Sequence, residues 1–254
     1  MKSAVNKSID SFLKKKGIKS NSKTNYKVSI ITPTNEFHSL PNILENFQRQ
    51  DLKEKELIII INNNEIDEYK WKNSVSKYEN IQVFKLDENI SLGECLNFGI
   101  EKAKYDIIAR FDADDYYGPK YLLDSIKGFE YSDALLIGKA TIFVYFVQNK
   151  ILAIKDSGLE NQYVYFVNGS TMIFKKELFE KVKFRNISCS EDLYFCKDCI
   201  ENNIKIYSLN KYHIVYIRQS NLDKHTWKLK NEDLFRLYCH PIGKVDDFIP
   251  YIDI

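Results

Sequence analysis

The side chains with the clearest capacity for chemistry lie in the stretch YDIIARFDADDYYGP, residues 105–119, where an apolar run leads into Asp112, Asp114 and Asp115. Alternate residues of an extended segment share one side, so we expect Asp112 and Asp114 to face the same way across the small Ala113. Two carboxylates held this close repel each other unless a cation lies near them. Oxygen ligands of this kind suit Mg²⁺ or Mn²⁺, which complete their coordination with water and substrate phosphates.

The same acids also allow a purely structural interpretation. Asp114 or Asp115 could cap a helix that begins near Pro119, because Asp accepts hydrogen bonds from the free N–H groups of a helix start and Pro is favoured in the first turn. A DxD pattern also occurs by chance. The strands and helices around these residues therefore have to be predicted before a metal site can be distinguished from a helix cap.

Those elements follow a repeating pattern from Tyr26 onward, where β-branched apolar runs alternate with helical patterns. Such alternation predicts a parallel sheet with helices on both faces, and the run LIIII at 57–61 is typical of a central strand. After Pro119 the pattern changes to longer strand-like runs, including one at 134–147, a helix at 191–203 and two late strands. No linker separates the two halves, so we expect one continuous structure with a mixed second half.

Three polar features follow predicted strands directly. They are TPTNEF at 32–37 after the first strand, NNNEID at 62–67 after the second, and the acidic cluster after the fourth. Ligands of open α/β sheets bind beyond the carboxyl ends of the strands. We therefore expect these features to meet at one edge of the sheet and to form a ligand site.

Four stretches together resemble the family 2 glycosyltransferases. They are VSIITPTNE at 28–36, ENISLGECLNFGIEKAKYDIIARFDADD at 88–115, NGSTMIFKKELFEKV at 168–182 and SEDLYFCKD at 190–198. Their order and spacing are more specific than any one of them alone. The resemblance implies the GT-A fold, an α/β fold in which a Rossmann-like, mostly parallel sheet with helices on both faces is fused to a mixed acceptor-binding half.

The resemblance also implies a domain division. It predicts one glycosyltransferase domain at 26–230, made of a nucleotide-sugar-binding half at 26–115 and an acceptor half at 116–230. An N-terminal extension at 1–25, with a short helix, and a C-terminal extension at 231–254 would flank it.

The activity that the resemblance implies is transfer of a hexosyl or N-acetylhexosaminyl group from a nucleoside diphosphate sugar, with UDP expected, to an acceptor hydroxyl with inversion. The family's nucleotide contacts, carried over by position, fall on the strand-end loops and on the helix before the fourth strand. They are Thr32, Pro33, Thr34, Glu36, Asn62, Asn64, Asn89, Gly93, Asn97, Arg110, Asp112 and Ala113. The family commonly has paired aspartates where this chain has Asn62 and its neighbours, and an Arg where it has Leu96. Asn can still hydrogen-bond a base or ribose, although without charge.

The catalytic groups are also assigned by the resemblance. A divalent metal, Mn²⁺ or Mg²⁺, would be held by Asp112 and Asp114, with His225 as a further contact from the loop at 218–227. Asp192 would be the base, and Glu191 would orient the acceptor or support the site. The simpler interpretation of these two acids is a helix start capped by Ser190, which is compatible with catalysis.

The donor or acceptor sugar is expected to lie against Gly169 and Ser170, although these two residues are equally consistent with a plain turn. His225 is likewise consistent with a solvated loop residue. The acceptor is left open among glycan, lipid-linked and protein hydroxyls. The oligomeric state is left open as well.

Three other functions share part of the pattern. A phosphatase of the haloacid-dehalogenase type carries a DxD, but on its first strand and followed by a different residue from Tyr116. A nucleotidyltransferase would need a Gly- and Arg-rich loop after the first strand, which this sequence lacks. A non-catalytic nucleotide-sugar binder fits the neutral second loop, whereas the DxD and the acidic pair favour an enzyme.

The overall composition indicates which classes of partner and which cellular compartment to expect. Lys and Arg number 37 against 35 Asp and Glu, and a net charge of +2 gives no field that attracts nucleic acid. The five scattered cysteines do not resemble a disulfide framework. The first 25 residues have no apolar stretch of signal-peptide length. We therefore expect a cytoplasmic protein, and we leave open a peripheral contact with the inner face of the membrane.

Overall fold

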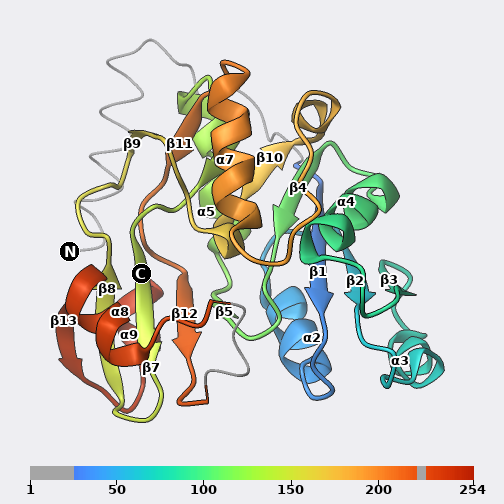
Figure 1. The fold of residues 1–254 in the computed structure, drawn as a ribbon, viewed down its shortest axis with the longest axis horizontal. Helices are drawn as coiled ribbons and strands as arrows, with labels where there is room; N and C mark the ends of the chain where they lie inside the picture. The colour runs from blue at the N-terminus through green and yellow to red at the C-terminus, as the bar shows by residue number, and fades with distance from the viewer. Residues whose placement is uncertain (1–25, 222–226) are drawn as a thin grey trace.

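The computed structural model describes residues 26–221 and 227–254 (Figure 1). The predicted helix within residues 1–25 lies outside the described residues. The described chain forms two sheets with helices packed around them (Figure 1).

The larger sheet has eight strands in the order β3-β2-β1-β4-β10-β6-β11-β9. Its strands are β1 (Val28–Thr34), β2 (Lys55–Ile61), β3 (Ile81–Lys85), β4 (Ile107–Arg110), β6 (Leu136–Gly138), β9 (Gln162–Val164), β10 (Ile173–Lys175) and β11 (Ile206–Ser208). The first four are parallel, β10 is antiparallel to both β4 and β6, and β9 is antiparallel to β11. The predicted parallel first half and mixed second half are thus confirmed.

Helices cover both faces of this sheet (Figure 1). Ile58 and Ile60 of β2 belong to the core shared with α4 (Leu92–Lys102) and α7 (Glu191–Glu201). Leu57, Ile59 and Ile61 belong to the core on the opposite face. The helices of that face are α2 (Leu40–Arg49), α3 (Glu68–Val75) and α5 (Tyr121–Ile126), followed by α6 (Gly128–Tyr131). A strand buried on both faces reads as an unbroken apolar run, which explains the LIIII sequence.

The second sheet has the order β13-β8-β7-β12-β5. Its strands are β5 (Tyr116–Tyr117), β7 (Ile142–Phe146), β8 (Ile151–Lys155), β12 (Ile214–Arg218) and β13 (Cys239–Lys244). The remaining elements are the 3₁₀ turns η1 (Gly169–Thr171) and η2 (Lys176–Glu180) and the helices α8 (Asn231–Tyr238) and α9 (Ile249–Ile252). Because β13 pairs with β8, the C-terminal residues form part of this sheet.

The apolar run at 134–147 was expected as one strand, and the structure divides it between the two sheets. The break falls at Lys139, whose Nζ donates to the carbonyl oxygen of Asn210 at 2.5 Å. This acceptor compensates the buried ammonium at the point where the chain passes from β6 into β7. Within the part of the chain that the structure describes, no helix is long and apolar enough to cross a membrane.

Candidate active site

The acidic loop leaves the carboxyl end of β4 and is held by buried groups on both sides. The backbone N–H of Asp112 donates to the Tyr117 hydroxyl at 2.8 Å, and that hydroxyl donates to the carbonyl oxygen of Ser170 at 2.8 Å. The Tyr117 ring stacks on Phe111 with 3.8 Å between ring centroids. The loop therefore has a fixed backbone, which a binding site requires.

Amide side chains of α2 support the same loop through its backbone carbonyl oxygens. Asn42 Nδ2 donates to the carbonyl oxygens of Ala113 and Asp115 at 2.8 and 3.0 Å, and Asn46 Nδ2 donates to that of Asp115 at 2.8 Å. Asp115 is buried, and its Oδ1 accepts a hydrogen bond from the Ile217 backbone N–H at 3.0 Å. Asp115 is thus a support of the loop rather than an exposed ligand.

The helix-cap interpretation of these acids is wrong. Helix α5 begins at Tyr121, its N-cap residue is Lys120, and no side chain caps it. Asp114 and Asp115 lie in the turn before β5, where they cannot reach the first N–H groups of α5 as caps. The acidic cluster therefore needs another explanation.

Negative charge accumulates in the loop. Burial, together with the carboxylates of Asp112 and Glu36, raises the pKa of Asp114 to about 7, although Arg218 opposes the shift. Burial and then the neighbouring Asp114 and Asp112 also raise the pKa of Asp115. Carboxylates whose pKa values are raised by one another are stabilised by an added cation.

The residues present fit a hard divalent metal. Asp112 and Asp114 offer carboxylate oxygens, and Asp112 is still about a third exposed. Among the described residues, no group of three or more His, Cys, Asp or Glu side chains is arranged to hold an ion by itself. A metal bound here would therefore need water or substrate oxygens to complete its coordination, as is usual for Mg²⁺ sites. His225 lies outside the described residues.

The acidic pair opens helix α7 close to the end of β4 (Figure 1). Glu191 is buried, and its Oε1 accepts a hydrogen bond from Arg110 Nη1 at 2.8 Å. Burial raises the pKa of Glu191, and the Arg110 guanidinium opposes that shift. Ser190 has a left-handed backbone with φ of 64° and makes no side-chain cap bond, so its predicted capping role is wrong.

Asp192 points toward the turn η1. Its Oδ2 accepts a hydrogen bond from the Gly169 N–H at 3.1 Å, and its Oδ1 accepts one from the Leu193 N–H at 2.7 Å. A Cβ added to Gly169 would lie 2.8 Å from Arg110 Nη1 and 3.0 Å from Asp192 Oδ2. Gly169 thus forms the predicted turn and also leaves room for the two charged side chains.

The loops after β1, β2 and β3 are joined to one another by asparagine side chains. Asn63 Nδ2 donates to the carbonyl oxygen of Asn35 at 2.9 Å. Asn62 Nδ2 donates to the carbonyl oxygen of Asp87 at 2.7 Å, and Asn64 Nδ2 donates to Asp87 Oδ2 at 3.1 Å. The predicted meeting of the loops after β1 and β2 is confirmed, and the loop after β3, which was not predicted, joins them.

Asp87 is a candidate residue that the sequence analysis missed. Its Oδ1 accepts hydrogen bonds from the N–H and Nδ2 of Asn89 at 2.9 and 2.8 Å. The Asn89 backbone N–H, followed by the side chains of Asn64 and Asn89, lowers the pKa of this exposed carboxyl. The residue follows a strand end, so the rule applied to the first, second and fourth strands would have found it in the third.

Two other residues predicted to contact the nucleotide, Asn97 and Gly93, instead pack against neighbouring segments of the chain. Asn97 Nδ2 donates to the carbonyl oxygen of Phe184 at 2.9 Å, and Asn97 Oδ1 accepts from the Phe184 N–H at 3.0 Å. Gly93 packs so closely that an added Cβ would lie 1.9 Å from the carbonyl oxygen of Arg185. Both residues fix α4 against the segment before α7.

The loop after β1 combines buried and accessible positions. Thr32 is buried, and its Oγ1 has no hydrogen-bond partner among the described residues. Thr34 Oγ1 lies 2.9 Å from Ser39 Oγ and accepts from the Glu36 N–H at 3.2 Å. Pro33 and Glu36 are partly exposed, so they remain available to a ligand.

Arg218 is the first residue of the loop expected at 218–227, and it is instead fully buried at the end of β12. Its Nε donates to Asn231 Oδ1 at 2.9 Å, and its Nη2 donates to the carbonyl oxygen of Leu229 at 2.6 Å. These bonds attach the C-terminal segment to the second sheet.

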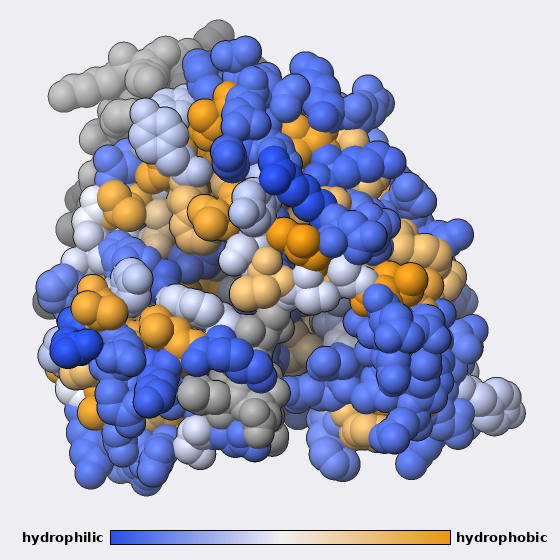
Figure 2. All heavy atoms as spheres, in the orientation of Figure 1, coloured by the Kyte–Doolittle hydropathy of each residue, from blue (hydrophilic) through white to orange (hydrophobic). Residues whose placement is uncertain are grey.

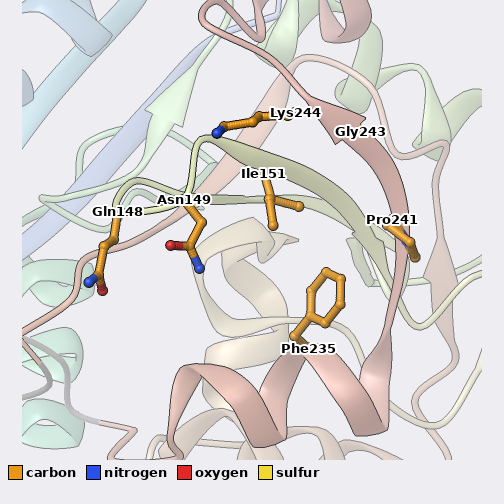
Figure 3. A pocket seen from close by; sticks show the side chains of 7 residues that line it. All are labelled: Gln148, Asn149, Ile151, Phe235, Pro241, Gly243 and Lys244. Carbon is orange, nitrogen blue, oxygen red and sulfur yellow. The ribbon is translucent and has the colours of Figure 1, made fainter.

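Two hollows lie in the surface of the described chain, and the second of them lies apart from the candidate site residues. The space-filling view is hollowed between the part that carries α2 and α3 and the part built on the second sheet (Figure 2). A separate hollow of about 420 Å³ lies between α8 and the β8–β13 pair, where Phe235 and Ile151 point into it from opposite sides (Figure 3). None of the residues lining this second hollow belongs to the acidic loop or to the acidic pair.

Residues 29–185 match the sequence profile described as glycosyl transferase family 2, and this match covers more than half of the 254 residues. The chain belongs to this family. The resemblance noted from four stretches of sequence is therefore confirmed.

Two family relatives are glycosyltransferases by name. The amylovoran biosynthesis glycosyltransferase AmsE of Erwinia amylovora is 26% identical over 110 residues, which are 41% of this chain and 40% of AmsE. The uncharacterized glycosyltransferase MJ1057 of Methanocaldococcus jannaschii is 26% identical over 212 residues, which are 78% of this chain and 72% of that protein.

Solved structures of a GT-A glycosyltransferase, S. aureus TarS, share the fold. Residues 1–349 of TarS in complex with UDP-GlcNAc give a TM-score of 0.64 at 16% identity, covering 83% of this chain and 64% of that chain. The UDP complex gives a TM-score of 0.60 at 17% identity, covering 76% and 61%. This likeness confirms the predicted GT-A fold, and the chain spans somewhat less than two thirds of those TarS chains.

Proposed function

We propose that this chain transfers a sugar from a nucleoside diphosphate sugar, with UDP as the expected nucleotide, to an acceptor hydroxyl with inversion. The observation that carries the proposal is the meeting of the acidic loop after β4 with the acidic start of α7, joined by Arg110 with hydrogen bonds of 2.8 Å on each side. Family membership and the TarS structures with UDP and UDP-GlcNAc support the same reading.

The donor side is formed by the strand-end loops. Asn62, Asn64 and Asp87 lie at the ends of β2 and β3 and carry amide and carboxylate groups that hydrogen-bond a base or ribose. Asp87 supplies a carboxylate beside Asn62 and Asn64, which stand where the family commonly has paired aspartates. The diphosphate then lies toward Asp112 and Asp114, which would hold Mn²⁺ or Mg²⁺. When bound, the metal would stabilise the negative charge of the departing diphosphate.

The acceptor side is formed by the start of α7 and by η1. Asp192 is held by the N–H groups of Gly169 and Leu193, and its carboxylate accepts the proton of the attacking hydroxyl. The C–O bond to the acceptor forms as the bond from the anomeric carbon to the diphosphate breaks, through an oxocarbenium-like transition state. Attack from the face opposite the diphosphate inverts the anomeric centre.

Calorimetry with UDP, in the presence and absence of Mn²⁺, tests the donor side. We expect binding that requires the metal, together with slow hydrolysis of one UDP-sugar from a panel that includes UDP-GlcNAc. Binding without any turnover, even with candidate acceptors, would favour the non-catalytic nucleotide-sugar binder. Absence of binding to UDP and to other nucleoside diphosphates would contradict both functions.

A further inference from the structure

Arg110 joins carboxylates from the two halves of the candidate site. Its Nε donates to Asp112 Oδ1 at 2.8 Å and its Nη2 donates to Asp112 Oδ2 at 3.3 Å. Its Nη1 donates to Glu191 Oε1 at 2.8 Å. Asp112 follows β4, whereas Glu191 begins α7, so one guanidinium spans the boundary between the donor and acceptor sides.

The guanidinium is also enclosed. Arg110 is only 5% exposed. The η1 turn packs against it so closely that a Cβ on Gly169 would come within 2.8 Å of Nη1. Three of its N–H groups are already directed at carboxylates, which leaves little surface for a nucleotide.

We propose that Arg110 is a positioning residue, which fixes the spacing between Asp112 on the donor side and Asp192 on the acceptor side. This inference rests on the proposed function, because a transfer reaction needs both groups at one spacing. It replaces the nucleotide contact that the family resemblance implied for Arg110.

The physical reason lies in the shape of the guanidinium. Its planar fork can serve Asp112 with two N–H groups and Glu191 with a third, whereas the single ammonium of a Lys cannot reproduce both directions. Glu191 is adjacent to Asp192 in the first turn of α7, so holding Glu191 also fixes the base. A displacement of about 1 Å in such a site costs roughly 10²-fold in rate.

The experiment compares Arg110→Lys and Arg110→Met with the unchanged chain. Arg185→Met is the matched control, because Arg185 also grips α7 through a two-point ion pair, with Nη2 2.6 Å from Asp198 Oδ1 and Nε 2.9 Å from Asp198 Oδ2. In that pair Arg185 is exposed and Asp198 is partly exposed, and neither is one of the candidate catalytic residues. The readouts are the Kd of UDP with and without Mn²⁺, and the kcat and KM of UDP-sugar hydrolysis.

A positioning role predicts a loss in kcat of roughly 10²-fold for both Arg110 variants. It also predicts a higher Mn²⁺ concentration for half-maximal activity, while the Kd of UDP at saturating Mn²⁺ stays within about 3-fold, because no nucleotide contact is lost. Arg185→Met should match the unchanged chain. A raised Kd for UDP at saturating Mn²⁺ with unchanged kcat would show a direct nucleotide contact, and native kinetics in Arg110→Lys would also overturn the proposal.

A second measurement needs no ligand and remains valid if the chain binds no UDP. Arg110→Met leaves Glu191 as a buried charge without its partner, which should lower Tm by roughly 5–15 °C. Adding Glu191→Gln should restore at least half of that loss without restoring kcat. Additive Tm effects of the two substitutions would contradict the link across the site.

If Arg110→Met does not fold, Gly169→Ala tests the same geometry without removing a charge. The added methyl group would press on Arg110 and Asp192 together, so kcat should fall while the Kd of UDP at saturating Mn²⁺ is kept. Unchanged kcat in this variant would count against the proposal.

Discussion

The Gly169 N–H and Asp192 Oδ2 form a hydrogen bond of 3.1 Å that joins the turn before β10 to the first turn of α7. The Leu193 N–H binds the other oxygen of the same carboxylate at 2.7 Å. Each oxygen therefore has one backbone donor and still has capacity to accept a further proton or hydrogen bond. Two backbone donors thus orient the carboxylate and leave it able to accept a proton, which is the arrangement that a general base requires.

Asp192→Asn should keep this shape and remove the basicity. Loss of general-base assistance typically lowers the rate by about 10²–10⁴-fold, so we expect that loss in sugar transfer or in UDP-sugar hydrolysis. The Kd of UDP with Mn²⁺ should stay near the native value, because the nucleotide loops lie elsewhere. Asp198→Asn on the same helix is the control. Native turnover in Asp192→Asn would remove Asp192 from the mechanism, and a selective loss in Glu191→Gln would reverse the two roles.

Asp114→Ala should abolish the metal dependence of UDP binding. Asp114 shares the loop with Asp112, and the two carboxylates together offer the oxygen ligands of the proposed metal site. Calorimetric titration of UDP at several Mn²⁺ concentrations measures the effect, and Asp106→Ala, an exposed acid at the opposite end of β4, is the control. Metal-dependent binding that survives in Asp114→Ala would place the metal elsewhere.

Local sequence patterns were sufficient to predict the supports of this site. The period of apolar residues along the chain identifies a strand or a helix. This local signal was sufficient for the strands β1, β2 and β4 and for the helices α4 and α7. The strand-end rule then placed Asn62, Asn64 and Asp112 at one edge of the sheet.

The contacts between these elements could not be predicted in the same way. Arg110 and Glu191 are 81 positions apart, and no local period relates them. The pairing of β13 with β8 and the buried bonds of Arg218 likewise depend on the three-dimensional fold. Sequence reasoning therefore identified the candidate groups, whereas the structure supplied their partners.

Gly93→Ala should destabilise the protein and leave the nucleotide affinity unchanged. The added Cβ would lie 1.9 Å from the carbonyl oxygen of Arg185, so α4 and that segment must separate. Overpacking of this kind costs about 1–3 kcal/mol in the free energy of unfolding. Urea denaturation measures the loss, and UDP calorimetry at low temperature measures binding to the folded variant. Weaker UDP binding with native stability would instead support the nucleotide contact that the family resemblance implied for Gly93.

Lys139 should make the stability of the protein depend on pH above neutrality. Its side chain is fully buried, its Nζ donates to the carbonyl oxygen of Asn210 at 2.5 Å, and burial lowers its pKa to about 8 although Asp124 and Glu160 oppose the shift. In the unfolded chain the pKa returns to its ordinary value of 10.5. Between these two values the unfolded chain binds a proton that the folded chain lacks, so the free energy of unfolding rises with pH in this window.

Below about pH 8 both states are protonated, and the full cost of burying the charge is present. Lys139→Met removes the titrating group and keeps the apolar stem. From about pH 7.5 to 9.5 the unchanged chain should therefore gain roughly 2 kcal/mol of unfolding free energy relative to Lys139→Met, measured by urea denaturation at each pH. For the exposed Lys127→Met control, the difference from the unchanged chain should stay constant over this range. A constant difference for Lys139→Met as well would mean that the Lys139 ammonium keeps its proton throughout, and that the Asn210 carbonyl and nearby acids offset its burial.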